Sequence, residues 1–221
     1  MTTVEHTARQ TGPITLHIDT QAADVQVVAD PRVTGTIFEL STPDTDGAAV
    51  DAIRTARFRD DGADVYLTVR SEGTTINGPV QFGNGNVQIN GMTMTNGRIV
   101  VNGMVVNGTN FGSGPITVRA ITEPGSAVDV KTMSGDVVTK NVAAVRARTM
   151  SGEIRAEGLS ADSALKSMSG DIRVSGTGDG AAPLVTATTM SGDVYGVGVD
   201  LAGKSMSGRV WQRRASAVDE W

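Results

Sequence analysis

Apolar or small residues alternate with charged or polar residues along most of the C-terminal half of the chain. An alternation of period two is typical of a β-strand with one buried face. The pattern recurs in five segments, each ending in a methionine. Five residues before that methionine the sequence has Val128, Val145, Ser163, Val185 and Leu201, and two residues before it Lys131, Arg148, Lys166, Thr188 and Lys204.

Each methionine opens a five-residue motif in which Ser-Gly, an acidic residue and Val or Ile follow. Copies occupy 133–137, 150–154, 168–172, 190–194 and 206–210, and they begin 17, 18, 22 and 16 residues apart. The last copy has Arg209 in the acidic position. A recurring period indicates a repeat fold, and Ser-Gly between two alternating segments is typical of a turn. The motif therefore predicts an all-β protein, a β-solenoid (β-helix) with coils of about 17–18 residues.

Three positions of the motif form columns if the coils stack in register. The β-branched column is predicted to face inward. The methionine column is predicted to fill the interior beside the corner, with an exposed, adaptable binding stripe as the alternative. The β-branched column contains Val137, Ile154, Ile172, Val194 and Val210, and the methionine column contains Met133, Met150, Met168, Met190 and Met206.

Two charged columns are the candidate interaction ladders. The acidic column contains Asp136, Glu153, Asp171 and Asp193, and the basic column contains Lys131, Arg148, Lys166 and Lys204. Stacked carboxylates could hold calcium, but the Gly-Gly-x-Gly-x-Asp pattern of calcium-binding solenoids is missing. We therefore expect each carboxylate to bond the backbone of the turn, with the basic column compensating its charge. No metal site and no cofactor are predicted.

Asn-Gly dipeptides punctuate residues 87–108 at steps of 6, 6 and 5. Asn-Gly between alternating residues is typical of a β-hairpin, whereas three sides of six residues would equal one solenoid coil. The agreement with the downstream period favours one continuous solenoid over residues 76–212, with hairpins as the alternative.

Both ends of the chain differ from the repeats. Residues 1–75 contain alternating segments and are predicted to form a small β-rich N-terminal cap. Residues 47–57 within the cap place Ala49, Val50, Ile53 and Ala56 on one helical face, behind the capping candidates Asp44 and Thr45. Trp211 and Trp221 bracket a polar segment, and residues 213–221 are predicted to be a C-terminal cap or tail.

Composition excludes several classes of protein. The 221-residue chain has a net charge of -5 and a pI near 5.0, which argues against sequence-independent nucleic-acid binding. No segment approaches the ~18 apolar residues of a membrane span, and no apolar leader begins the chain, so we expect a cytoplasmic protein without membrane insertion. The absence of cysteine excludes disulfides and thiolate zinc sites.

Few residues of the chain are candidates for a catalytic role. His6 and His17 are the only histidines, and both lie far from every motif serine. The serines also lack the Gly-x-Ser-x-Gly context of a nucleophile. The sequence therefore predicts no enzyme, and a small-molecule substrate is not expected.

The Met-Ser-Gly-Asp-Val/Ile units, together with residues 115–131, resemble the bacterial β-strand-repeat "putative adhesin" family, a domain of unknown function. The resemblance covers roughly residues 10–212. It implies a β-solenoid fold, no catalytic residues and a link to envelope functions.

Two main hypotheses for function remain. The first is an interaction or scaffold module, a rigid rod that binds protein partners along one face. The second is self-association of the coils end to end into a bactofilin-like cytoplasmic filament. A polysaccharide-binding or polysaccharide-cleaving β-helix is a more remote alternative, because a chain with 4% aromatic residues offers little surface for sugar stacking.

Overall fold

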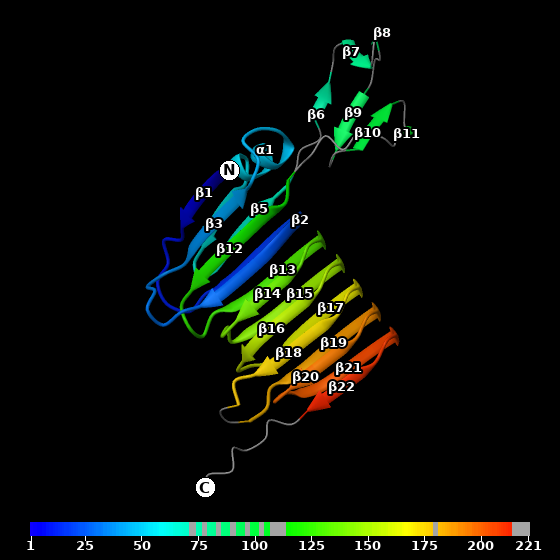
Figure 1. Cartoon of the computed structure of the whole chain (residues 1–221). Coiled ribbons are helices and arrows are strands. Elements are labelled where there is room, and N and C mark those ends of the chain that lie inside the picture. The colour runs from blue at the N-terminus through cyan, green and yellow to red at the C-terminus, as the bar shows by residue number, and fades with distance from the viewer. Residues whose placement is uncertain are drawn as a thin grey trace.

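In a computed structural model, residues 1–70, 114–178 and 181–213 are described, together with the backbone of six short strands between residues 74 and 106. The described part of the chain is all-β with one helix, α1 (Figure 1). Most strands are parallel and belong to one nearly closed, solenoid-like sheet of sixteen strands.

The elements up to the first motif include the helix and the six short strands. They are β1 (Thr2–Thr7), β2 (Thr15–Ala29), β3 (Ile37–Thr42), α1 (Ala48–Arg54), β4 (Arg57–Asp61), β5 (Asp64–Val69), β6 (Thr74–Ile76), β7 (Pro79–Phe82), β8 (Gly85–Gln88), β9 (Met92–Thr95), β10 (Arg98–Val101), β11 (Met104–Val106) and β12 (Ile116–Thr122).

From residue 127 onward each repeat supplies one strand before the motif corner and one after it. These are β13 (Ala127–Ser134), β14 (Val137–Lys140), β15 (Ala144–Ser151), β16 (Ile154–Leu159), β17 (Ser163–Ser169), β18 (Ile172–Gly176), β19 (Leu184–Ser191), β20 (Val194–Val197), β21 (Asp200–Ser207) and β22 (Val210–Arg213). The strands before the corner pair with one another, and so do the strands after it, so the coil has two sides.

We call the side made by β5, β2, β13, β15, β17, β19 and β21 the long-strand sheet, and the side made by β12, β2, β14, β16, β18, β20 and β22 the short-strand sheet. β2 belongs to both, because its first half pairs with β5 and β13 and its second half with β12 and β14. Although it lies within residues 1–75, β2 is thus part of the stack of coils.

Motif copies lie in register on neighbouring coils. The pairs are Ser134 with Ser151, Ser151 with Ser169, Ser169 with Ser191 and Ser191 with Ser207. The methionine before each serine therefore stacks on the methionine of the next coil, as predicted. Parallel strands of one sheet are about 4.8 Å apart, so this is also the step between successive methionines.

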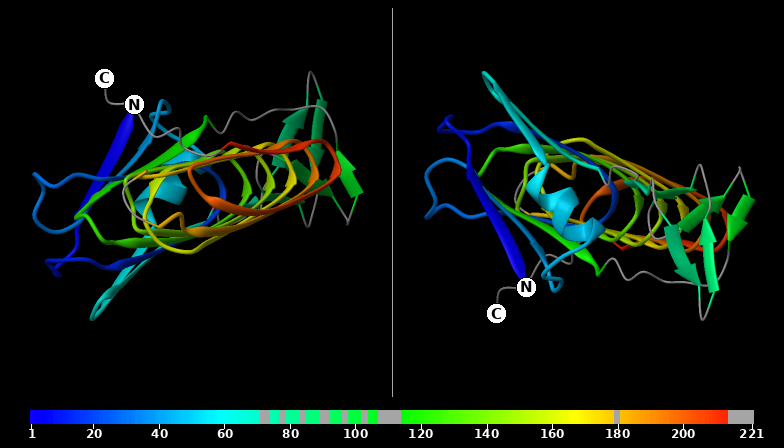
Figure 2. Two further views of the ribbon diagram at one scale, coloured as in Figure 1. Left: turned by 90° about the horizontal axis from the view of Figure 1, so that it is seen from below. Right: turned by 90° about the horizontal axis from the view of Figure 1, so that it is seen from above.

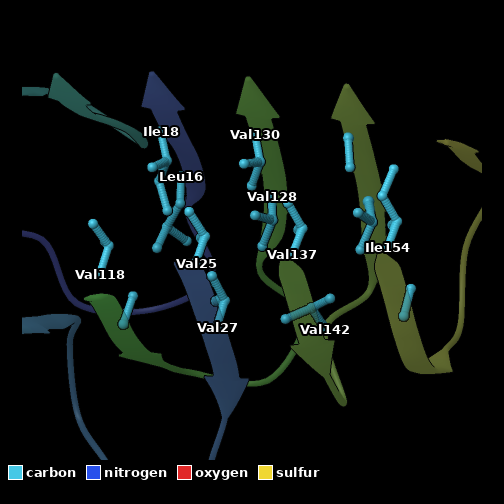
Figure 3. Packing of buried hydrophobic residues seen from close by; sticks show 14 of the residues in the cluster. Leu16, Ile18, Val25, Val27, Val118, Val128, Val130, Val137, Val142 and Ile154 are labelled. Carbon is cyan, nitrogen blue, oxygen red and sulfur yellow. The ribbon is translucent and has the colours of Figure 1, made fainter. Parts of the chain in front are cut away.

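The core lies between the two sheets. Val137, Ile154, Ile172 and Val194 are completely buried, which confirms the prediction for these four members of the β-branched column. Figure 3 shows Val137 and Ile154 beside Val128 and Val130 of the long-strand sheet. The prediction was wrong for Val210 of the last described coil, which is 42% exposed, and β22 pairs on one side only within the described sheet.

The N-terminal end of the coil is covered. Figure 2 shows α1 lying across this end, and Ala49, Val50 and Ile53 are buried there as the helical pattern predicted. The capping prediction was wrong, because Gly47 is the N-cap and makes no side-chain cap bond. Asp44 instead accepts a hydrogen bond from the Gly114 N–H, at 2.5 Å.

The short strands between β5 and β12 do not continue the coil. β6, β9, β10 and β11 form one antiparallel sheet, and β7 and β8 form another. The predicted continuous solenoid is therefore wrong for these strands, and the hairpin alternative describes them. Their Asn-Gly dipeptides, the tail from residue 214 and Trp221 lie outside the described residues.

Candidate binding face

The motif methionines form a row on the outer surface of the long-strand sheet. Their exposed fractions are 55% for Met133, 48% for Met150, 42% for Met168, 47% for Met190 and 71% for Met206. The prediction that they fill the interior was wrong. Successive side chains of a strand point to opposite faces, and the buried Thr132 therefore directs Met133 outward, on the same face as Lys131.

A row of cations runs parallel to the methionine row, two residues earlier on each strand. Lys131, Arg148, Lys166, Thr188 and Lys204 pair in register across β13, β15, β17, β19 and β21. The four cations of this basic row are exposed. Among the described residues, none of them has an ion-pair partner within 4.0 Å.

Beside the basic row the same surface is hollowed into a groove of about 410 Å³, which extends across β2, β13, β15, β17 and β19. Small side chains such as Ala127 and Ala144 line it, and its charged residues are Arg146, Asp129 and Asp162. We call the methionine row, the basic row and this groove the binding face.

His17 stands at the N-terminal end of the groove. Its Nε2 is 3.0 Å from Asp64 Oδ1, its Nδ1 is 3.7 Å from Asp129 Oδ2, and its ring stacks on Tyr66 at 4.5 Å. His17 pairs with Asp129 of β13, and Asp129 lies five residues before the corner serine, Ser134, on the same strand. The structure does not bring this histidine and a motif serine together. His6, the other histidine, stacks on Phe58 in the N-terminal region.

The acidic column lies on the other side of the corner and is bonded to the backbone. Three of its four carboxylates, those of Asp136, Asp171 and Asp193, each accept a hydrogen bond from the backbone N–H at the equivalent position of the next coil. The bonds run from Glu153 N to Asp136 Oδ1 (2.8 Å), from Asp193 N to Asp171 Oδ1 (2.9 Å) and from Arg209 N to Asp193 Oδ1 (2.8 Å). These three carboxylates thus bond turn backbone, as predicted, but they join neighbouring coils rather than closing their own turn, and for Glu153 the prediction was wrong.

Arg173 compensates two carboxylates of this column. Its guanidinium donates hydrogen bonds to Glu153 and, at 3.0 Å, to Asp171 Oδ2. The bond to Glu153 raises the pKa of Arg173 above its ordinary value. Compensation therefore comes from Arg173, from Arg155 at 3.9 Å from Glu153, and from backbone N–H groups, not from the basic row. Within the described residues, no group of three His, Asp or Glu side chains is placed to hold a metal ion.

The motif glycines are required where the coils touch. A Cβ on Gly170 would lie 2.1 Å from the carbonyl oxygen of Gly152, and the φ of Gly170 is +142°. Gly135 makes the same approach to Ala23, where an added Cβ would lie 2.1 Å from the oxygen. Neither the close approach nor this φ suits a residue with a side chain.

The contact with Ala23 identifies a sixth, degenerate corner that sequence reasoning missed. Gln21–Val25 pairs in register with the first motif copy, and Asp24 Oδ1 accepts a hydrogen bond from Asp136 N at 3.0 Å. Gln21 and Ala23 stand where the motif has methionine and glycine. Only Asp24 and Val25 match the motif, and these two residues are the only sequence evidence for this corner.

A family model described as Toastrack DUF4097 matches residues 2–195 of the chain. A comparison with curated proteins found no match. Among the described residues, no helix is long and apolar enough to cross a membrane.

Three solved structures are similar to the chain along nearly its whole length. A "putative cell adhesion protein" from Clostridium sporogenes is 5% identical, with 97% of this chain and 99% of that chain covered and a TM-score of 0.46. A "putative adhesin" from Bacteroides fragilis is 10% identical, with 97% and 96% covered and a TM-score of 0.37. Another from Parabacteroides merdae is 7% identical, with 97% and 96% covered and a TM-score of 0.28. At these values no property of the three proteins is transferred to this chain.

Proposed function

The chain belongs to the Toastrack DUF4097 family, and we propose that it is a non-enzymatic interaction module that holds a partner against the binding face. One observation carries the proposal. Five exposed methionines lie in a straight row beside a row of cations that have no ion-pair partner among the described residues. A surface of this kind leaves both apolar area and charge available to a partner.

The fold suits this role because residues outside the binding face stabilise each coil. Buried Val and Ile side chains form the core, and glycine contacts and carboxylate bonds join neighbouring coils. In a repeat fold the stability is roughly a sum over repeats and their interfaces. The rows of the binding face are therefore free to vary for binding. Methionine is suited to it because its unbranched, polarisable side chain adapts to different contacts.

End-to-end self-association is the second candidate, and the last described coil favours it. Val210 and Trp211 there are 42% and 43% exposed, and β21 and β22 each pair on one side only within the described sheet. An open-ended filament needs two joinable ends. Because α1 covers the N-terminal end (Figure 2), we rank this candidate below binding through the face.

Single-cysteine variants test the proposed function, since the chain has no cysteine of its own. Lys166→Cys places a thiol on the binding face, and Lys140→Cys places one on the exposed outer surface of the short-strand sheet as the matched control. Maleimide labelling is compared between the purified protein and cells that make it. We expect slower labelling in cells at position 166 only. Equal rates in both settings at both positions would contradict the proposal.

A further inference from the structure

We propose that the partner on the binding face is an anionic lipid surface. The basic row would meet the phosphate head groups, and the methionine row would enter the boundary between head groups and acyl chains. This inference rests on the proposed function and specifies its partner.

Charge supports an anionic partner although the chain as a whole carries a net charge of -5. The acidic column is engaged in bonds to backbone N–H groups and to Arg173. The basic row has no such compensation among the described residues. Asp19, which occupies the same row on β2, is 3.2 Å from Arg70 and is therefore paired. The groove beside the basic row contains Arg146 but also Asp129 and Asp162, so the uncompensated positive charge of this face lies along the basic row.

Shape supports a planar partner. Figure 1 shows the ends of β13, β15, β17, β19 and β21 in a line, and the methionines lie just before these ends. With steps of about 4.8 Å, the row from Met133 to Met206 is about 19 Å long. A flat surface can contact all five methionines together.

The presence of a methionine row beside the basic row favours a lipid surface over other anionic partners. A row of phosphates on a nucleic acid would match the basic row but would leave the methionine row exposed. An interfacial lipid layer offers both chemistries at adjacent depths, since apolar side chains enter it while cations remain at head-group level. An acidic protein with an apolar stripe is the competing partner, and the experiment distinguishes it.

The experiment uses the purified full-length chain and two vesicle preparations, phosphatidylcholine alone and phosphatidylcholine mixed with phosphatidylglycerol. We expect co-sedimentation with the mixed vesicles only, weakened at 1 M salt, where the Debye length falls to about 3 Å. The triple variant Lys131→Gln, Arg148→Gln, Lys166→Gln should bind the mixed vesicles about 100-fold more weakly, since each cation near an anionic surface contributes roughly five-fold.

The matched control is Lys140→Gln, Arg155→Gln, Arg213→Gln, which removes the same charge from the short-strand sheet. It should bind as the parent does. A third variant, Met150→Gln with Met168→Gln, should weaken binding at low and at high salt. Circular dichroism verifies that all three variants fold.

Equal loss in the two triple variants, or no binding of the parent to mixed vesicles, would overturn the lipid proposal. If position 166 is still protected in cells in that case, the interaction module stands and its partner is a protein. If position 166 is also unprotected, the proposed function fails as well.

Discussion

The acidic column and the basic row look alike in the sequence but differ in the structure. Both recur once per coil, and they flank the same methionine. Three carboxylates of the acidic column accept backbone N–H bonds from the next coil and the fourth, Glu153, pairs with Arg173, whereas the cations of the basic row have no ion-pair partner among the described residues. Recurrence by itself therefore does not separate residues that join coils from residues available for binding. Their hydrogen-bond partners do.

The largest effect is expected at the glycine that joins two coils. Gly170→Ala should lower the free energy of unfolding by about 4 kcal/mol, because its Cβ would meet the carbonyl oxygen of Gly152. Gly62→Ala is the control. Gly62 also has a positive φ, +61°, but nothing lies within 4 Å of the added Cβ, so about 1 kcal/mol is expected. Urea titration measures both, and similar losses would show that backbone strain alone explains the glycines.

A charge should destabilise the protein more in the β-branched column than in the methionine row. Ile172→Asp should lower the free energy of unfolding by at least about 3 kcal/mol, since it places a charge in a fully buried site. Met168→Asp, four residues earlier and 42% exposed, should change it by no more than about 0.5 kcal/mol. Thermal melting measures the stability of the two variants relative to the parent. A large loss for Met168→Asp would mean that the methionine row packs against something in the folded protein.

A smaller effect separates the two charged rows. Asp171→Ala should cost about 1 kcal/mol, because it removes the acceptor of the Asp193 N–H bond and a partner of Arg173. Lys166→Ala should have almost no effect on stability. Chemical denaturation of both variants measures the difference, and equal costs would remove the distinction between the rows.

Removal of divalent metal should have no effect. The carboxylates already have backbone and guanidinium partners, and within the described residues no metal-binding cluster is found. The melting temperature in EDTA should equal that in calcium. A fall in EDTA that calcium reverses would show that the acidic column binds the ion.

Much of the fold was predictable because the repeat constrains it strongly. The β-branched residue after each corner had to face inward, and Ile154 and Ile172 do. The short helix also followed from its apolar face, although its N-cap is Gly47 rather than a polar side chain. Stacking in register followed from the constant motif, because each Gly fits only against the backbone of the neighbouring corner.

The sequence already contained evidence against a buried methionine row. Lys131 and Met133 are two residues apart on one strand and must share a face, so an exposed Lys131 already required an exposed Met133. The hydrophobic character of methionine outweighed this alternation in the prediction. The degenerate corner at Gln21–Val25 was harder to find because its methionine and glycine are replaced. For the Asn-Gly segment, spacing alone could not distinguish a corner of a coil from a hairpin turn.

Peroxide oxidation of the folded protein, followed by peptide mass spectrometry, tests whether the methionine row is exposed to solvent. We expect rapid oxidation at similar rates for all five methionines of the row, with an unchanged melting temperature; they are Met133, Met150, Met168, Met190 and Met206. Protection of these five methionines until the protein unfolds would place them in the core, and the binding face would not exist.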